Sequence, residues 1–228
     1  MVTFVSHRHR VCPDDQRPGV DTGGLWKTVG GNLVLVDRET ETLWSQMLGW
    51  AMRGPLEGEV LELLPSVMTD WGTWKKRHPQ TTAAIMRRTS NRYVRSLIGP
   101  DSGHILAIAK AHSSRCWSFT DLFREEAIND SFGDIPVVAT FDASSKTASL
   151  FDRRVNGRVL TFEGQDGLLI DQQTKSEWDP VTGIAVTPPM KGTHLIRLPA
   201  IISDHAVWTM YHPKTTLWHS RPASGQSD

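Results

Sequence analysis

The chain has 228 residues, with 25 basic and 25 acidic side chains, nine tryptophans and two cysteines. The balanced charge and the lack of a long Lys/Arg run argue against nucleic acid as a partner, because such binding neutralises phosphates with clustered cations. No apolar run approaches the ~18 residues that a membrane span requires, and His7 and Arg8 interrupt the N-terminus before a signal peptide could form. As written, the sequence predicts a soluble, cytoplasmic protein with no transmembrane segment.

In the first hundred residues, the pattern predicts a strand over Leu33–Val36 and a second strand through Trp44. A stretch rich in Pro and Gly follows, and then a strand over Glu59–Leu64. A short helix is expected from about Thr69 to Arg77. It must end before Pro79, because the residue before a proline avoids the α conformation.

The second part of the chain begins with an apolar strand over His104–Lys110. Ser118 and Asp121 form a capping-box pattern, which predicts a helix from there to about Ala127. A final short helix is expected over Ser203–Tyr211. Between the two helices, turn-forming residues separate four short strands of a predicted antiparallel meander: Ile135–Phe141, Thr147–Phe151, Arg158–Phe162 and Gly167–Ile170.

An internal duplication relates the two parts. Residues 37–82 align without a gap to residues 171–216, with 16 identities in 46 positions. Unrelated segments of ordinary composition would share about three. The identical residues are mostly Gly, Pro, Trp and polar turn formers, which indicates that both copies have the same turns and the same buried aromatic residues.

These observations predict an α+β, strand-rich fold made of two related copies of a mostly antiparallel β unit. Each copy has a short helix, and the copies are expected to pack with pseudo-twofold symmetry in one compact domain. Residues 1–100 form the first repeat, which is N-terminally incomplete. Residues 101–228 form the second repeat, which starts with a strand–helix lead-in that the first repeat has no room for.

The identities also connect the chain to a known family. The sequence Asp37-Arg-Glu-Thr-Glu-Thr-Leu-Trp-Ser-Gln46 is followed by Gly49, Gly54-Pro55-Leu56-x-Gly58, Leu61, Pro65 and Trp74-x-x-x-His78-Pro-x-Thr81. This string resembles the bacterial and archaeal family catalogued as domain of unknown function 3179. The second copy, with its equivalent residues from Asp171 to Thr215, resembles the weaker repeat that follows in such proteins.

The resemblance implies relatives that are longer, often exported or lipid-anchored, and without an established activity. Many members have a Cys-Pro-x-Cys element just after their first strand, a candidate for metal or redox chemistry. Here Val5 and Arg8 occupy those cysteine positions, and the nearest cysteine is Cys12. The element is therefore missing, and we expect the chain to lack the N-terminal part of the family as well. A misplaced start codon is one explanation of this short start.

Three pairs of equivalent residues are candidate site residues: Asp37 and Asp171, Trp74 and Trp208, and His78 and His212. Each Asp precedes a Thr by three residues, a spacing typical of a self-capped turn, with an active acid as the alternative. Each Trp and His are four residues apart, so both side chains lie on one helix face. The histidine falls at the helix C-terminus, where the macrodipole favours its charged form.

Two functional classes remain open. The first is a binding or structural module, in which the paired tryptophans are core residues and the ligand is a small molecule or a glycan. The second is a metal-dependent or redox enzyme that uses His78 and His212 as equivalent ligands. We expect any ligand-facing aromatic residue among the tryptophans without a Trp partner in the other copy, which are Trp26, Trp50, Trp71, Trp117 and Trp218. No cofactor and no metal site is assigned.

Overall fold

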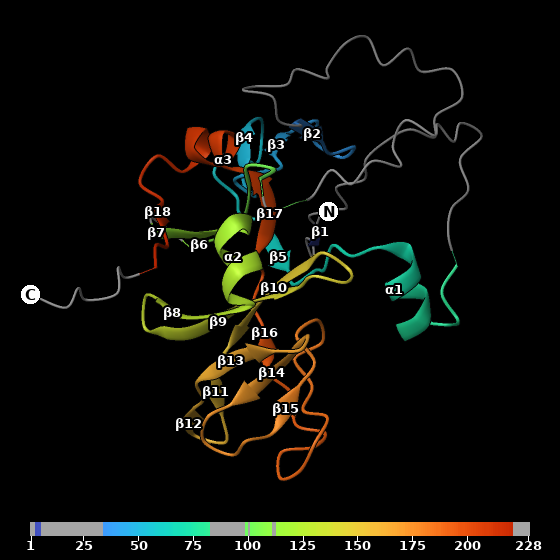
Figure 1. The fold of residues 1–228 in the computed structure, drawn as a ribbon. Helices are drawn as coiled ribbons and strands as arrows, with labels where there is room; N and C mark the ends of the chain where they lie inside the picture. The colour runs from blue at the N-terminus through green and yellow to red at the C-terminus, as the bar shows by residue number, and fades with distance from the viewer. Residues whose placement is uncertain (1–2, 6–33, 83–98, 100, 111–112, 221–228) are drawn as a thin grey trace, which may run out of the picture.

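The computed structural model describes residues 3–5, 34–82, 99, 101–110 and 113–220. Within these residues it contains three short helices and several mostly antiparallel sheets, so the predicted α+β, strand-rich class is confirmed (Figure 1). No helix in the described part is long and apolar enough to span a membrane.

The helices are α1 (Trp71–Arg77), α2 (Phe119–Glu125) and α3 (His205–Tyr211). The strands are β1 (Thr3–Val5), β2 (Val34–Val36), β3 (Leu43–Ser45), β4 (Ala51–Arg53), β5 (Glu62–Leu64), β6 (His104–Lys110), β7 (Ser113–Ser118), β8 (Ala127–Phe132), β9 (Ile135–Asp142), β10 (Thr147–Asp152), β11 (Arg154–Val155), β12 (Arg158–Val159), β13 (Phe162–Gln165), β14 (Leu168–Asp171), β15 (Glu177–Trp178), β16 (Ile196–Arg197), β17 (Ile201–Asp204) and β18 (Thr216–Leu217).

Two four-stranded sheets form the centre of the molecule, with strand orders β16-β10-β9-β8 and β17-β6-β7-β18. Two three-stranded sheets, β2-β3-β4 and β13-β14-β15, lie on either side of this centre (Figure 1). All strand pairs in these sheets are antiparallel except β18 with β7, which is parallel. The central sheets therefore combine strands that are close in sequence with strands from the C-terminal end.

The main core lies between the two central sheets and includes helix α2. Strand β9 is buried on both faces because its side chains alternate in direction. Val137 and Ala139 pack in the main core, whereas Val138 packs with Phe162 and Trp178 of the outer sheet. This double burial explains why the strand is apolar along most of its length.

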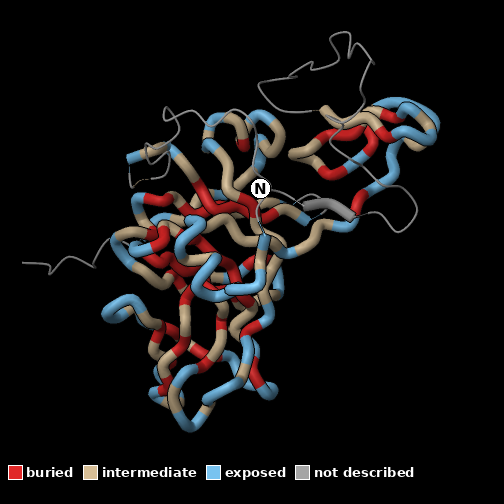
Figure 2. The backbone as a smooth tube through the Cα atoms, turned by 90° about the vertical axis from the view of Figure 1, so that its right-hand side faces the viewer, coloured by how far each residue is buried: buried red, intermediate tan, exposed pale blue. Residues whose placement is uncertain are grey.

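Strand β6 is also buried on both faces. Leu106 and Ile108 face the main core, and Ile105 and Ala107 pack beneath Trp208 of α3. Figure 2 shows the buried residues along these central strands, with exposed residues at the turns. The layers thus run from α3, through the two central sheets around α2, to the outer sheet β13-β14-β15.

Helix α2 begins as predicted, because the Ser118 hydroxyl accepts a hydrogen bond from the Asp121 amide at 3.0 Å. Its apolar face buries Phe119 and Leu122. The predicted end at Ala127 is wrong, since Glu126 adopts a positive φ of 55° and Ala127 begins β8.

Strands β7 and β8 were not predicted, because their sequences are polar and do not alternate. They pair within the two central sheets, where tertiary contacts bury Cys116, Trp117 and Ile128. The predicted strand over Arg158–Phe162 is also wrong as one element. It is divided between β12 and β13.

Candidate functional site

Asp37 forms a closed turn with the residues that follow it. Its carboxylate accepts hydrogen bonds from the Thr40 amide at 2.7 Å, the Thr40 hydroxyl at 2.9 Å and Trp44 Nε1 at 2.9 Å. Burial raises the pKa of Asp37, but these hydrogen bonds lower it by more, so the net pKa is below its ordinary value. The side chain is 1% exposed. A buried carboxylate with this many donors is a structural anion rather than a free acid.

Asp171 makes the same contacts in its own turn. It accepts hydrogen bonds from the Thr174 amide, the Thr174 hydroxyl at 2.6 Å and Trp178 Nε1 at 2.9 Å. Asp171 and Trp178 are both fully buried. The spacing from Asp to Trp is seven residues in both turns. The self-capped turn predicted for both aspartates is present at each.

A third turn of this kind was not predicted from the sequence. Asp142 accepts hydrogen bonds from the hydroxyls of Ser144 at 2.7 Å and Ser145, and Ser145 contacts the Thr147 hydroxyl at 2.6 Å. Lys146 has a positive φ of 54°. The seventh residue after Asp142 is Ser149 rather than Trp, so this turn shares the Asp but not the Trp of the other two. The shared pattern Asp-x-x-Ser/Thr-x-Ser/Thr is the signal that would find all three turns.

The Trp–His pairs also have matching geometry. The ring centroids of Trp74 and His78 are 4.0 Å apart, and those of Trp208 and His212 are 4.0 Å apart. Each histidine is the C-cap of its helix, and its backbone N–H donates to the tryptophan carbonyl. The prediction that Trp and His lie on one helix face is therefore confirmed.

The surroundings of the two pairs differ. Trp208 of α3 is 1% exposed. Helix α1, in contrast, has no buried residue and projects from the centre of the molecule (Figure 1). Helices α1 and α3 lie in separate parts of the molecule, so His78 and His212 are not brought together at one site. In the described part of the chain, no group of three or more His, Cys, Asp or Glu side chains is placed to hold a metal ion.

Each tryptophan N–H donates to a threonine hydroxyl, Trp208 to Thr215 at 2.9 Å and Trp74 to Thr81 at 3.2 Å. We expect Thr215→Val to lower the free energy of unfolding by about 1–3 kcal/mol, because the buried Trp208 N–H loses its acceptor. Thr81→Val is the matched control and should cost less than about 1 kcal/mol, since the half-buried Trp74 has access to water. Urea unfolding of both variants measures the difference. Equal losses would contradict the assignment of Trp208 as the buried member.

The expectation that the helix end keeps histidine charged is wrong for His212. Burial lowers the pKa of His212 below 6.5, and a hydrogen bond to the Met47 backbone offsets this only in part. Protonation would also leave an N–H at Nε2 without an acceptor, since this buried atom has no hydrogen-bond partner among the described residues.

The stability of the protein should therefore depend on pH through His212. Because the folded state binds this proton less readily than the unfolded state, the contribution is fully present above pH 6.5 and decreases as the pH falls below 6.5. We expect His212→Gln to reduce this dependence, as measured by thermal unfolding from neutral to mildly acidic pH. His78→Gln, at the C-cap of α1, is the control and should keep the dependence. An unchanged slope in His212→Gln would refute this role.

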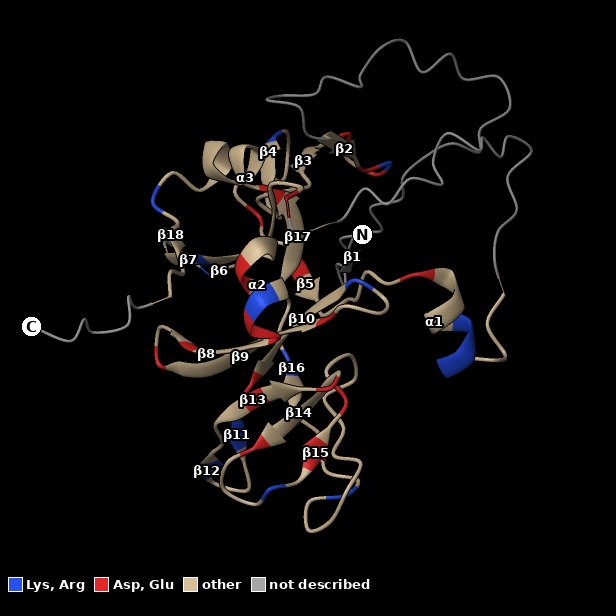
Figure 3. Cartoon of the chain, in the orientation of Figure 1, with Lys and Arg blue, Asp and Glu red and all other residues tan. Residues whose placement is uncertain are grey.

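Contacts between the two halves involve the same regions of each. Arg77 at the end of α1 forms an ion pair with Asp179 at 2.6 Å, and Thr69 contacts Thr147 at 2.8 Å. Figure 3 shows the basic residues that gather in the last turn of α1. In the other direction, Met47 of the first half packs in the cluster around Trp208. Each half thus contacts the other near its Trp-containing turn and near its helix.

The tryptophans expected to face a ligand have varied surroundings. Trp50 and Trp71 are exposed, at 46% and 53%, and Trp218 is half-buried. Trp117 is fully buried, so the expectation is wrong for this residue. Trp26 lies outside the described residues. The burial of Trp117 follows from its place in β7, which packs against the main core.

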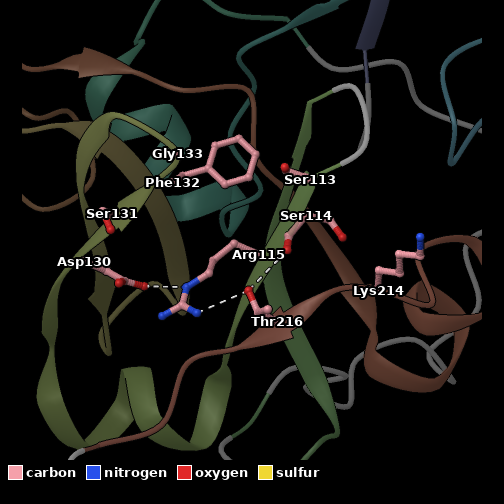
Figure 4. Close-up of a pocket in the computed structure, with 9 residues that line it drawn as sticks. All are labelled: Ser113, Ser114, Arg115, Asp130, Ser131, Phe132, Gly133, Lys214 and Thr216. Atoms are coloured by element: carbon pink, nitrogen blue, oxygen red, sulfur yellow. Dashed lines mark hydrogen bonds and ion pairs between the residues drawn. The ribbon is translucent and has the colours of Figure 1, made fainter.

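A polar pocket of about 350 Å³ opens between β7, the β8–β9 turn and β18 (Figure 4). It was not predicted, because β18 joins β7 and β8 there from 101 residues further along the chain. Ser113, Ser114, Arg115, Asp130, Ser131, Phe132, Gly133, Lys214 and Thr216 line it. Its volume lies within the range typical of small-molecule sites.

Arg115 and Asp130 form the ionic centre of this pocket. The Arg115 Nε donates to Asp130 at 2.8 Å, and the Arg115 Nη1 donates to the Thr216 hydroxyl at 3.2 Å. Trp117 Nε1 donates to the same Asp130 oxygen at 3.0 Å. The buried Trp117 therefore fixes the carboxylate that in turn orients Arg115 along the pocket wall.

Cys116 does not indicate thiol chemistry at this pocket. Burial raises the pKa of Cys116, which is free and packs beneath α3. A raised pKa keeps a thiol protonated and unreactive. Cys12 lies outside the described residues.

Comparison with known proteins gives a family but no activity. The comparison with curated proteins found no match, and neither did the comparison with solved structures. The family model described as "Protein of unknown function (DUF3179)" matches residues 20–99 and 95–226, which together make up most of the chain. The chain therefore belongs to the DUF3179 family of proteins of unknown function.

Proposed function

We propose that this protein is a small-molecule-binding module built from two copies of one unit, with its ligand site in the polar pocket between β7, the β8–β9 turn and β18. The observation on which this rests is the pocket itself, which is lined by polar side chains, several of them without a hydrogen-bond partner among the described residues. The paired Asp, Trp and His residues have a structural role, in that they stabilise the fold that holds the pocket.

The two-copy architecture is supported by hydrogen bonds that recur 134 residues apart. The Leu61 amide donates to the Gly49 carbonyl at 2.7 Å, and the Leu195 amide donates to the Gly183 carbonyl at 2.8 Å. Further pairs of the same kind surround these residues. We propose that residues 1–100 and 101–228 are the two copies, that they are related by a pseudo-twofold axis, and that they form one compact domain.

A framework role for the candidate site residues is supported by their hydrogen bonds. Both aspartates are buried and accept from a tryptophan and a threonine of their own turn. Substrate or metal would have to displace these internal donors. The pocket differs, since the hydroxyls of Ser113, Ser114 and Ser131 make no hydrogen bond to the described residues outside it or within it. Binding groups without internal partners favour a ligand site there.

The proposal is tested by screening a panel of neutral and anionic monosaccharides and their phosphates for a rise in melting temperature. Ser131→Tyr should abolish the rise given by any ligand, because the larger side chain fills the pocket. Arg158→Tyr, at an exposed position of β12 away from the pocket, should retain it. If no compound stabilises the protein, or if Ser131→Tyr binds as well as the wild type, the pocket is not the ligand site.

A further inference from the structure

The lining of the pocket has a net positive charge. Arg115 and Lys214 are cations, and Asp130 is the one acidic residue among the nine that line it. The Asp130 carboxylate is already engaged by Arg115 and by the Trp117 indole. Its charge is therefore balanced within the pocket wall, which leaves the charge of Lys214 uncompensated.

Lys214 is placed to receive a ligand group. It directly follows Pro213 and lies just before β18, whose parallel pairing with β7 fixes the backbone beside the pocket. Its ammonium group makes no ion pair or hydrogen bond with the described residues. Figure 4 shows Lys214 at the opposite end of the lining from Asp130. A ligand at this end meets a cation that has no carboxylate beside it.

Hydroxyl groups occupy the space between the charged ends. Ser113 and Ser114 lie between Phe132 and Lys214 in Figure 4. The Thr216 hydroxyl is already bound by Arg115, but the serine hydroxyls have no partner among the described residues. A hydroxyl both donates and accepts, so a serine on the pocket lining matches a hydroxyl group of a polyol.

From this arrangement we infer that the ligand is a small polyol with one anionic group, a sugar acid or a sugar phosphate, oriented with its anion toward Lys214. The inference rests on the proposed binding function and adds the chemical class of the ligand. The carboxylate and the phosphate share the chemistry that Lys214 recognises, and the experiment separates them.

Calorimetric titration with glucose, glucuronate and glucose 6-phosphate tests the inference. At low ionic strength, at least one anionic probe should bind more tightly than glucose, and Lys214→Gln should weaken that probe about three- to tenfold, because a charge-assisted hydrogen bond is lost. Glucose binding should change less than about twofold in this variant. Lys191→Gln, at an exposed lysine outside the pocket, is the matched control and should bind all probes like the wild type. A preference for glucuronate or for glucose 6-phosphate identifies the anion.

The possible failures separate the two proposals. If glucose binds as tightly as the anions and Ser131→Tyr abolishes its binding, the binding function stands and the anionic class is wrong. If Lys214→Gln leaves the affinity for both anions unchanged, the orientation toward Lys214 is wrong. If none of the probes binds to the wild type, both the binding function and the ligand class are overturned.

Discussion

Replacing Trp178 by alanine is expected to lower the free energy of unfolding by about 3–5 kcal/mol, the usual cost of removing a large aromatic side chain from a core. Trp178 is fully buried, and its ring packs edge-on against Phe162 with 5.7 Å between centroids. The substitution also leaves Asp171 without one of its donors. Chemical denaturation followed by circular dichroism measures the loss.

An exposed tryptophan provides a matched control. Trp50 is 46% exposed, so Trp50→Ala should change the free energy of unfolding by less than about 1 kcal/mol. Trp44 is 2% exposed and makes the same hydrogen bond as Trp178, so its replacement should resemble that of Trp178. If Trp178→Ala were as stable as Trp50→Ala, the framework role of the Trp-containing turns would be wrong.

Replacing Asp171 by alanine should cost about 2–4 kcal/mol, because several buried donors lose their acceptor at once. The affected groups are the Thr174 amide, the Thr174 hydroxyl and Trp178 Nε1. Asp171→Asn keeps one acceptor oxygen and a similar volume, so we expect a smaller loss. Thermal and urea unfolding of the two variants provide the measurement.

Asp101→Ala is the control for this prediction, since Asp101 is exposed in a turn and should tolerate the change. A stable, folded Asp171→Ala protein that had lost ligand binding would argue for an active acid. We expect the reverse: Asp171→Ala loses stability, and any loss of ligand binding is a consequence of unfolding.

Local patterns explain which parts of the fold could be predicted. The Ser118 cap, the helix stop before Pro79 and the Asp-x-x-Thr turns depend on residues within one turn of each other, and all are present in the structure. Strand β8 depends on distant partners instead. Its Asn129 amide bonds with both backbone groups of Phe162, a contact that no local pattern reveals.

The candidate site illustrates the same limit. His78 and His212 were predicted as site residues because they repeat, yet both are helix C-caps whose rings contact a tryptophan. The pocket residues do not repeat. Arg115 and Asp130 meet only because β7 and β8 belong to two sheets packed around one core, and Thr216 joins them only through the parallel pairing of β18. No local sequence pattern predicts the contacts among these three residues.

The parallel pairing of β18 with β7 has a consequence for folding. Thr216 lies 101 residues after Arg115, its partner in the pocket wall, and Ile201–Asp204 of β17 must return to β6 over a similar separation. Contacts of this separation form late and slow the folding of a domain, because the closure of a long loop precedes any gain from pairing. The sheet β17-β6-β7-β18 therefore stays incomplete until β17 and β18 pair with β6 and β7. Any ligand that needs Lys214 binds only to the fully folded chain.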